Sequence, residues 1–108
     1  MAVKVIADST SYIPRARRNA LDIRVVSLSS TLDGVTYLDD AEDYSDFYDA
    51  LAASPSWPTT SQPSVQALVD LMTERVEAGH EVVGVFISEL ISGTYSTALL
   101  ARDMVRET

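Results

Sequence analysis

The chain has 108 residues, 46% of them apolar, which is enough for one folded domain, and we expect that domain to span residues 1–108. Its 16 acidic residues outnumber eight basic ones, and the net charge of −8 disfavours nucleic acid and anionic lipid surfaces as partners. Cysteine is absent, which excludes disulfides and thiolate chemistry; because we also find no signal-peptide pattern and no bilayer-length apolar run, we expect a cytoplasmic protein without a membrane span.

The N-terminal region is predicted to be a strand followed by a polar loop and a short helix. Residues 3–7 form a β-branched run that is typical of a strand, and this run stops at the turn-forming residues 8–11. After Pro14, a basic segment that extends to Ala20 predicts a short helix, because proline is tolerated in the first helical turn.

The next part of the chain is predicted to contain a strand, a hairpin and a helix. Residues 23–31 indicate a strand, and Asp33-Gly34 then favours a small hairpin, because both residues tolerate the positive φ angles of a tight turn. Ser45 is predicted to cap the helix that follows. The intervening acidic residues lack the spacing and glycine of a calcium loop, so we expect a solvated loop and no metal site there. They are Asp39, Asp40, Glu42 and Asp43.

The C-terminal half contains the clearest helix and the clearest strand. Apolar residues recur at helical spacing over residues 65–76, and Gly79 suits the position just past the end of a helix. The continuous apolar run at 82–87 predicts a strand covered on both faces, and residues 95–106 predict a final helix. This order of elements favours an α/β fold, a three-layer domain with a parallel sheet and a small β-hairpin excursion.

Three polar loops are candidates for a ligand site, at residues 8–11, 59–64 and 88–94. In open parallel sheets ligands bind beyond the carboxyl ends of the strands, where helix N-termini offer unpaired N–H groups. The second and third loops contain no Lys, Arg or His, so a carboxylate held by hydroxyl and amide donors fits them better than a nucleotide. From the residues alone, helix capping remains the simpler interpretation of their hydroxyls. These belong to Ser61, Ser64, Ser92 and Thr94.

Other chemistry finds little support in the sequence. Neither of the glycine-rich nucleotide fingerprints occurs, and we expect no cofactor. The residues around Ser92 do not form the Gly-x-Ser-x-Gly elbow of a serine hydrolase, and no base is expected within its reach. A binding protein is therefore favoured over an enzyme.

Four segments of the chain resemble the DegV family in sequence and in order. The Thr-Ser-Gln-Pro-Ser and Ser-Gly-Thr-Tyr segments are specific in this order, whereas the other two are weak when taken singly. The resemblance extends from the first strand to the last helix, and implies an α/β domain of the DegV N-terminal type whose second lobe is absent from this chain. The matching segments are Ile6–Thr10, Leu32–Asp39, Thr60–Ser64, and Ser92–Tyr95 with Ala98.

The DegV resemblance also implies a function. Thr60 and Ser92 would bind the carboxylate of a long-chain fatty acid, whose tail would run into an apolar tunnel between two lobes. The resemblance further implies that such proteins carry acyl chains for a separate fatty-acid kinase and are not enzymes themselves. We expect supporting contacts from Ser61, Gly93 and Thr94, and a border of the site formed by Asp8, Ser9 and Thr10.

Three positions depart from the family pattern, and two other functions remain open. The family often has proline, serine and leucine where Ser27, Glu89 and Ile91 stand, and Glu89 adds an acid near the expected carboxylate site. One alternative is a serine-dependent acyl or phosphoryl transfer enzyme acting through Ser92, and the other is an isolated flavodoxin-like interaction domain. Without the second lobe an apolar strip would be exposed, which predicts either a homodimer through the exposed half-pocket or a missing partner chain.

Overall fold

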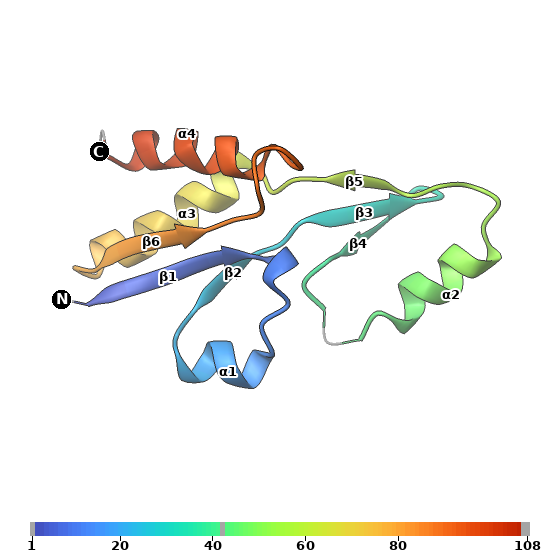
Figure 1. Ribbon diagram of the computed structural model, residues 1–108, viewed down its shortest axis with the longest axis horizontal. Coiled ribbons are helices and arrows are strands. Elements are labelled where there is room, and N and C mark those ends of the chain that lie inside the picture. Colours follow the sequence, from blue (N-terminus) through green and yellow to red (C-terminus); the bar gives the residue numbers. More distant parts are fainter. Residues whose placement is uncertain (1, 42, 107–108) are drawn as a thin grey trace.

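The computed structural model describes residues 2–41 and 43–106, which form an α/β fold built on two small sheets (Figure 1). The first sheet is parallel, with the strand order β2-β1-β6. The second is antiparallel, with the order β4-β3-β5. The predicted α/β class and the parallel sheet are confirmed. The strands are β1 (Val3–Asp8), β2 (Arg24–Val26), β3 (Ser29–Leu32), β4 (Val35–Leu38), β5 (Thr59–Ser61) and β6 (Glu81–Val85).

The predicted hairpin is confirmed as β3 and β4. Leu32 pairs with Val35, and the two turn residues between them, Asp33 and Gly34, have φ angles of 51° and 80°. Glycine adopts such angles without a steric cost, and aspartate tolerates them better than most residues. This explains why the chain reverses direction here.

Two predictions about the strands were wrong. Residues 23–31 do not form one strand, because β2 and β3 belong to different sheets. The expected loop at 59–64 begins with the strand β5, in which Thr60 pairs with Ser30 of β3. Pairing with β5 satisfies the second edge of β3, which would otherwise leave its backbone polar groups without partners, and threonine is a residue that favours strands.

The helices follow the predicted positions closely. The prediction that Ser45 caps α2 was wrong, because Ser45 is the first helical residue and both its N–H and its hydroxyl donate to Asp43 Oδ1, at 2.9 and 2.6 Å. Ser64 does cap α3, since its hydroxyl accepts the N–H of Ala67 at 3.1 Å. The helical segments are η1 (Ser9–Ser11), α1 (Arg15–Ala20), α2 (Ser45–Ala53), α3 (Val65–Glu77) and α4 (Thr94–Arg106).

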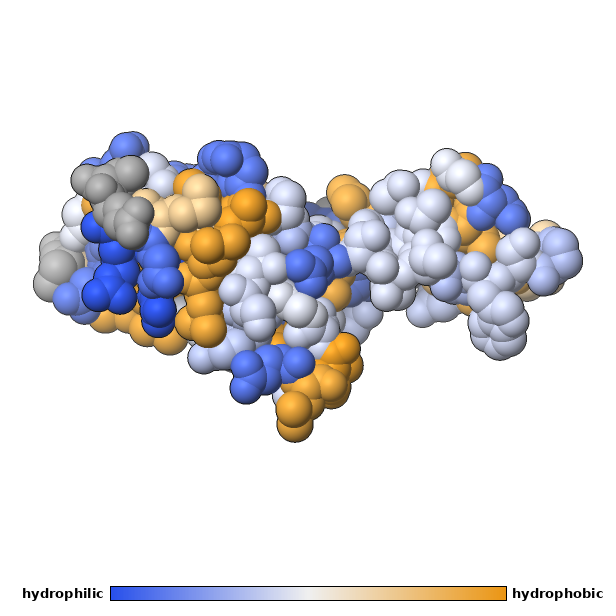
Figure 2. Space-filling view, turned by 90° about the horizontal axis from the view of Figure 1, so that it is seen from above, coloured by the Kyte–Doolittle hydropathy of each residue, from blue (hydrophilic) through white to orange (hydrophobic). Residues whose placement is uncertain are grey.

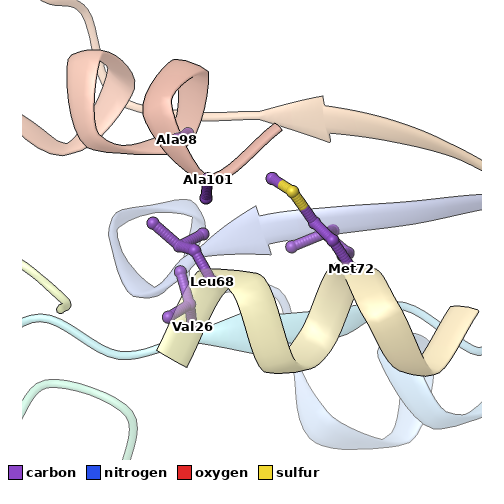
Figure 3. Close-up of a cluster of buried hydrophobic side chains, with 6 residues drawn as sticks. Val26, Leu68, Met72, Ala98 and Ala101 are labelled. Carbon is purple, nitrogen blue, oxygen red and sulfur yellow. The ribbon is translucent and has the colours of Figure 1, made fainter. Parts of the chain in front are cut away.

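The hydrophobic core lies between the parallel sheet and the two long helices α3 and α4 (Figure 3). Leu68 is fully buried at its centre, and the small side chains of Ala98 and Ala101 allow α4 to approach α3 closely. The short helix α1 lies on the other side of the sheet from α4 (Figure 1). The core residues are Ile6, Val26, Leu68, Met72, Ala98 and Ala101.

The strand β6 was predicted to be covered on both faces, and this was wrong for this chain. β6 lies at an edge of the sheet, and Val83 and Val85 expose 47% and 57% of their surface. Figure 2 shows further apolar side chains on the half of the molecule that carries α4. Among residues 2–41 and 43–106, no helix is both long and apolar enough to cross a membrane.

Candidate functional site

An open pocket of about 500 Å³ lies where the parallel sheet meets the small antiparallel sheet. Its walls come from the segments that follow β1 and β6, from the β3 and β5 strands, and from the loop that precedes α4. The pocket thus lies beyond the carboxyl ends of parallel strands, the edge at which such sheets bind ligands. The lining residues are Thr10, Tyr12, Leu28, Ser29, Ser30, Asp39, Thr60, Ser61, Gln62, Ile87, Ile91, Ser92 and Gly93.

Thr60 is the middle residue of β5 and lines this pocket. It pairs with Ser30 of β3. Thr60 is exposed, and no hydrogen-bond partner of its hydroxyl occurs among the residues that the structure describes. The hydroxyl can therefore donate to a bound oxygen atom without breaking an existing bond.

Ser92 reaches the same pocket from the loop before α4. Its Oγ accepts the N–H of Thr94 at 3.2 Å and lies 2.9 Å from the hydroxyl of Thr94. When Thr94 donates both of these bonds, the proton of Ser92 is left for a ligand. Thr94 is buried and does not line the pocket. It contacts Ser92 and can therefore support the site by orienting that side chain.

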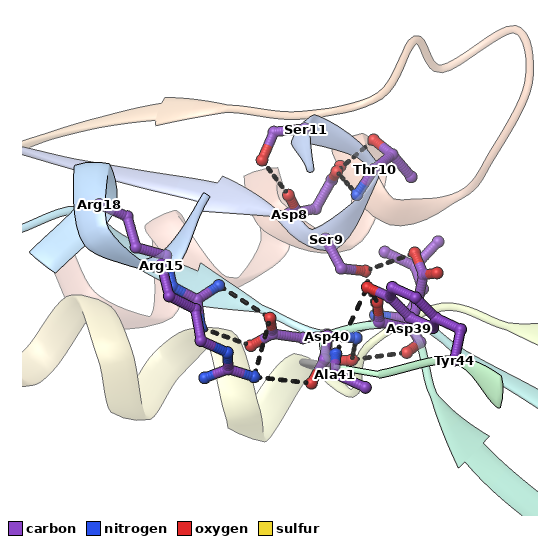
Figure 4. Close-up of polar contacts among 12 residues, drawn as sticks. Asp8, Ser9, Thr10, Ser11, Arg15, Arg18, Asp39, Asp40, Ala41 and Tyr44 are labelled. Carbon is purple, nitrogen blue, oxygen red and sulfur yellow. Dashed lines mark hydrogen bonds and ion pairs between the residues drawn. The ribbon is translucent and has the colours of Figure 1, made fainter. Parts of the chain in front are cut away.

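The first polar loop contributes less to the pocket than expected. Ser9 is buried; its hydroxyl donates to Asp39 Oδ2 and accepts the N–H of Leu28, both at 2.9 Å (Figure 4). Asp8 is also buried, and its carboxylate accepts the N–H of Thr10 at 2.9 Å and that of Ile87 at 2.7 Å. Of the three predicted border residues, only Thr10 lines the pocket, while Asp8 and Ser9 hold the surrounding chain in place.

Two lining residues that the sequence analysis did not assign to the site, Asp39 and Tyr12, influence the electrostatics of the pocket. Asp39 is the one carboxylate among the lining residues, which include no Lys, Arg or His. Tyr12 donates to Asp39 Oδ1 at 2.8 Å, and this bond is the main reason that the pKa of Tyr12 rises to about 12. Tyr12 therefore keeps its proton at neutral pH. Glu89, which we expected near the site, does not line the pocket.

The acidic segment after β4 was predicted to be a solvated loop, but one of its carboxylates is bound by an arginine. The guanidinium of Arg18 donates to both carboxylate oxygens of Asp40, at 2.8 and 3.0 Å (Figure 4). This bond raises the pKa of Arg18. Glu42 lies outside the described residues. In the described part of the chain, no three His, Asp or Glu side chains cluster in a way that would hold a metal ion.

Together these features define an α/β domain with an open pocket that is lined by hydroxyl-bearing residues from two separate chain segments. The profile of the DegV family, described as "Uncharacterised protein, DegV family", matches residues 2–108. This chain belongs to the DegV family.

Curated relatives agree with this assignment. A DegV domain-containing protein from Clostridium perfringens is 40% identical over 107 residues, which cover 99% of this chain and 38% of the relative. The protein DegV of Bacillus subtilis is 36% identical over 106 residues, which cover 97% of this chain and 38% of the relative. The chain therefore spans little more than a third of the length of these relatives.

Solved structures show the same fold. The DegV of Bacillus subtilis, described as a fatty acid binding protein, superposes with a TM-score of 0.88 at 35% identity, covering 97% of this chain and 38% of that one. A stearic acid-binding protein from Eubacterium ventriosum gives a TM-score of 0.88 at 31% identity, covering 97% of this chain and 37% of that one. These two proteins bind fatty acids according to their descriptions.

Proposed function

We propose that this chain binds a long-chain fatty acid in the cytoplasm, with the hydroxyls of Thr60 and Ser92 donating to the ligand's carboxylate. The observation that carries this proposal is that Thr60 and Ser92 line one open pocket, although they come from different parts of the fold. Ser61 and Gly93 line the same pocket and are proposed to support the head group. The description of solved relatives as fatty acid-binding proteins supports the choice of ligand.

The apolar lining residues indicate how the acyl tail would leave the head group. Ile87 and Ile91 line the pocket beside Ser92, and Leu90 in the same loop is almost fully exposed. An acyl chain that runs along these side chains would remove apolar surface from water, which is the main source of free energy for binding a lipid tail.

We propose that the bound fatty acid is presented to a separate fatty-acid kinase. The pocket is open at the surface, so a carboxylate held at its mouth would remain accessible to a second protein. Incubating the lipid-loaded protein with a bacterial fatty-acid kinase and ATP should yield an acyl phosphate that hydroxylamine traps as the hydroxamate. If the kinase is active but no hydroxamate forms, the result would argue against presentation of the bound fatty acid to the kinase.

A role as a serine enzyme receives less support from the geometry. The hydroxyl of Ser92 contacts Thr94, and no Lys or His lies among the lining residues to remove its proton. A serine-reactive acyl probe is therefore expected to leave Ser92 unlabelled in mass spectrometry. Stoichiometric labelling of Ser92 would favour the enzyme instead.

The fatty acid proposal is tested by extracting lipid from the purified protein. We expect long-chain fatty acid in the extract of the wild-type chain, and its loss from a Thr60→Val, Ser92→Ala double variant. The matched control is Ser96→Ala, which removes an exposed hydroxyl of α4 that does not line the pocket. Equal fatty acid content in the double variant and the control would rule out the assignment of the two donors.

We also propose that two copies of the chain associate through the exposed apolar loop at the rim of the pocket and leave its mouth accessible. Leu90 and Ile91 expose 92% and 76% of their surface beside it. The same apolar patch on two copies can meet across a two-fold axis, as in most homodimers. Burying this patch would remove apolar surface from water at the rim.

A further inference from the structure

Gln62 links the chain segment that carries Thr60 to the helix that follows Ser92. It comes directly after β5, and its side-chain Nε2 donates to Thr97 Oγ1 of α4 at 2.6 Å. On its way to Thr97, the carboxamide of Gln62 crosses the backbone at Gly93, which immediately precedes α4. Gln62, Gly93 and Thr97, called here the Gln62 latch, therefore connect the small sheet to the main body of the fold.

Gly93 has a steric reason to be glycine. A β-carbon built on it would overlap Gln62 Oε1 and lie 3.2 Å from Gln62 Cδ. Positive φ angles are found at Gly34 and Gly79 but not at Gly93, so its backbone conformation does not require glycine. What glycine provides at this position is room for the carboxamide of Gln62.

The latch connects the two halves of the proposed carboxylate site. Thr60 belongs to the antiparallel sheet, whereas Ser92 precedes a helix that packs on α3 and the parallel sheet. Two hydroxyls can hold one carboxylate only if their separation is fixed to a fraction of an ångström. We propose that Gln62 is a positioning residue, which sets the spacing of Thr60 and Ser92 through its contacts with Gly93 and Thr97.

This inference deepens the proposed function and rests on it, but the latch is first tested without ligand. In NMR spectra of the free protein, we expect cross-peaks from the side-chain amide protons of Gln62 to the α-protons of Gly93 and the methyl group of Thr97. A Gly93→Ala variant should lose them, and the backbone amide resonances of Thr60 and Ser92 should both shift. Because the displaced atom ends a flexible side chain, the fold itself should survive.

The matched control for this experiment is Gln66→Ala. The side-chain amide of Gln66 also donates a hydrogen bond, to Asp70 Oδ1 at 2.7 Å, but on the exposed surface of α3. The Gln66→Ala variant should leave the resonances of Thr60 and Ser92 unchanged. Missing cross-peaks in the wild-type protein, or unshifted resonances of Thr60 and Ser92 in Gly93→Ala, would overturn the positioning role even if no fatty acid binds.

Palmitate affinity then tests the role of the latch in binding. We expect Gly93→Ala and Thr97→Val each to weaken binding by about tenfold, the range that the loss of one hydrogen bond supports. Thr97→Ser keeps the hydroxyl and should retain the affinity. A wild-type protein that binds no palmitate would refute the proposed function, whereas the NMR cross-peaks would still decide whether the latch exists.

A double-variant cycle separates the latch from a direct role of Gly93. In a Gln62→Ala background the added β-carbon at position 93 meets no carboxamide, so Gly93→Ala should reduce the affinity less than twofold further. An undiminished tenfold loss in that background would show that Gly93 acts without Gln62, and would overturn the inference.

Discussion

Among residues 2–41 and 43–106, Asp22 and Arg75 form the ion pair with the most hydrogen bonds, and neither residue lines the pocket. Arg75 is buried in α3, and its guanidinium donates to both carboxylate oxygens of Asp22, at 2.9 and 2.8 Å. Lys4 adds a second contact with Asp22 at 3.0 Å. The Arg75 bond, followed by the Lys4 bond, holds the pKa of Asp22 well below its usual range.

The sign of this pKa shift predicts acid sensitivity. Because the folded-state pKa lies below the unfolded value of about 3.9, Asp22 stabilises the fold above that pH, and the contribution is lost as the pH falls toward the folded-state pKa. An Asp22→Asn variant, which still tolerates the φ of 54° at this position, should be less stable at pH 7. In urea denaturation the difference from the wild type should shrink between pH 5 and about pH 2. A difference that is independent of pH would contradict this assignment.

Leu68 tests how much one buried side chain contributes to the stability of the core. Its side chain is fully buried between α3, α4 and the sheet, so Leu68→Ala should reduce the free energy of unfolding by about 3 kcal/mol. The control is Leu100→Ala in α4, whose side chain is 54% exposed and which should change stability by less than about 0.5 kcal/mol. Urea denaturation of the two variants measures both values, and similar losses would mean that the core is placed wrongly.

At the scale of elements, local patterns predicted the helices and the hairpin, but not the partners of the strands. The helical spacing of residues 65–76 and the turn signal of Asp33-Gly34 depend on neighbours in sequence, and both features are present. The pairing of Thr60 with Ser30 joins residues far apart in the chain, and no local pattern reports it. The sequence therefore indicated Thr60 as a loop residue, whereas it occupies a strand.

Gly34 tests how much the turn of the β3–β4 hairpin contributes to stability. A β-carbon at this position would meet no atom within 4 Å, so the cost of Gly34→Ala comes only from its φ of 80°. We expect a loss of about 1 kcal/mol in unfolding free energy. Asp33→Asn, at the neighbouring turn position, should cost only a few tenths of this, because asparagine tolerates positive φ. Equal stability of Gly34→Ala and wild type in thermal denaturation would show that the hairpin does not contribute to the fold.

At the scale of the whole molecule, the class of fold followed from the order of elements, whereas the pocket required three-dimensional pairing. The two hydroxyl-rich segments were recognisable in the sequence, and the structure places Thr60 and Ser92 in one pocket. Asp39, Tyr12 and Gln62 were not assigned to the site, because their roles depend on contacts across the chain. For Gln62, the sequence offered one indication of a role, its place in the Thr60–Ser64 segment that resembles the DegV family.

The exposed rim of the pocket predicts self-association. A second copy that covers Leu90 should make the chain a dimer in multi-angle light scattering, and Leu90→Asp should shift it toward the monomer by placing a charge in the apolar contact. Leu21→Asp just after α1, also exposed but not among the residues that line the pocket, serves as the control and should remain dimeric. A monomeric wild type at high concentration would refute the proposed dimer.

Carbon-13 NMR of palmitate labelled at the carboxyl carbon tests whether Thr60 and Ser92 hold the carboxylate of a fatty acid. With the wild-type chain we expect a bound carboxyl resonance distinct from that of free palmitate. The Thr60→Val, Ser92→Ala variant should lose this resonance, and Ser96→Ala should keep it. An unchanged bound resonance in the folded double variant would contradict the account.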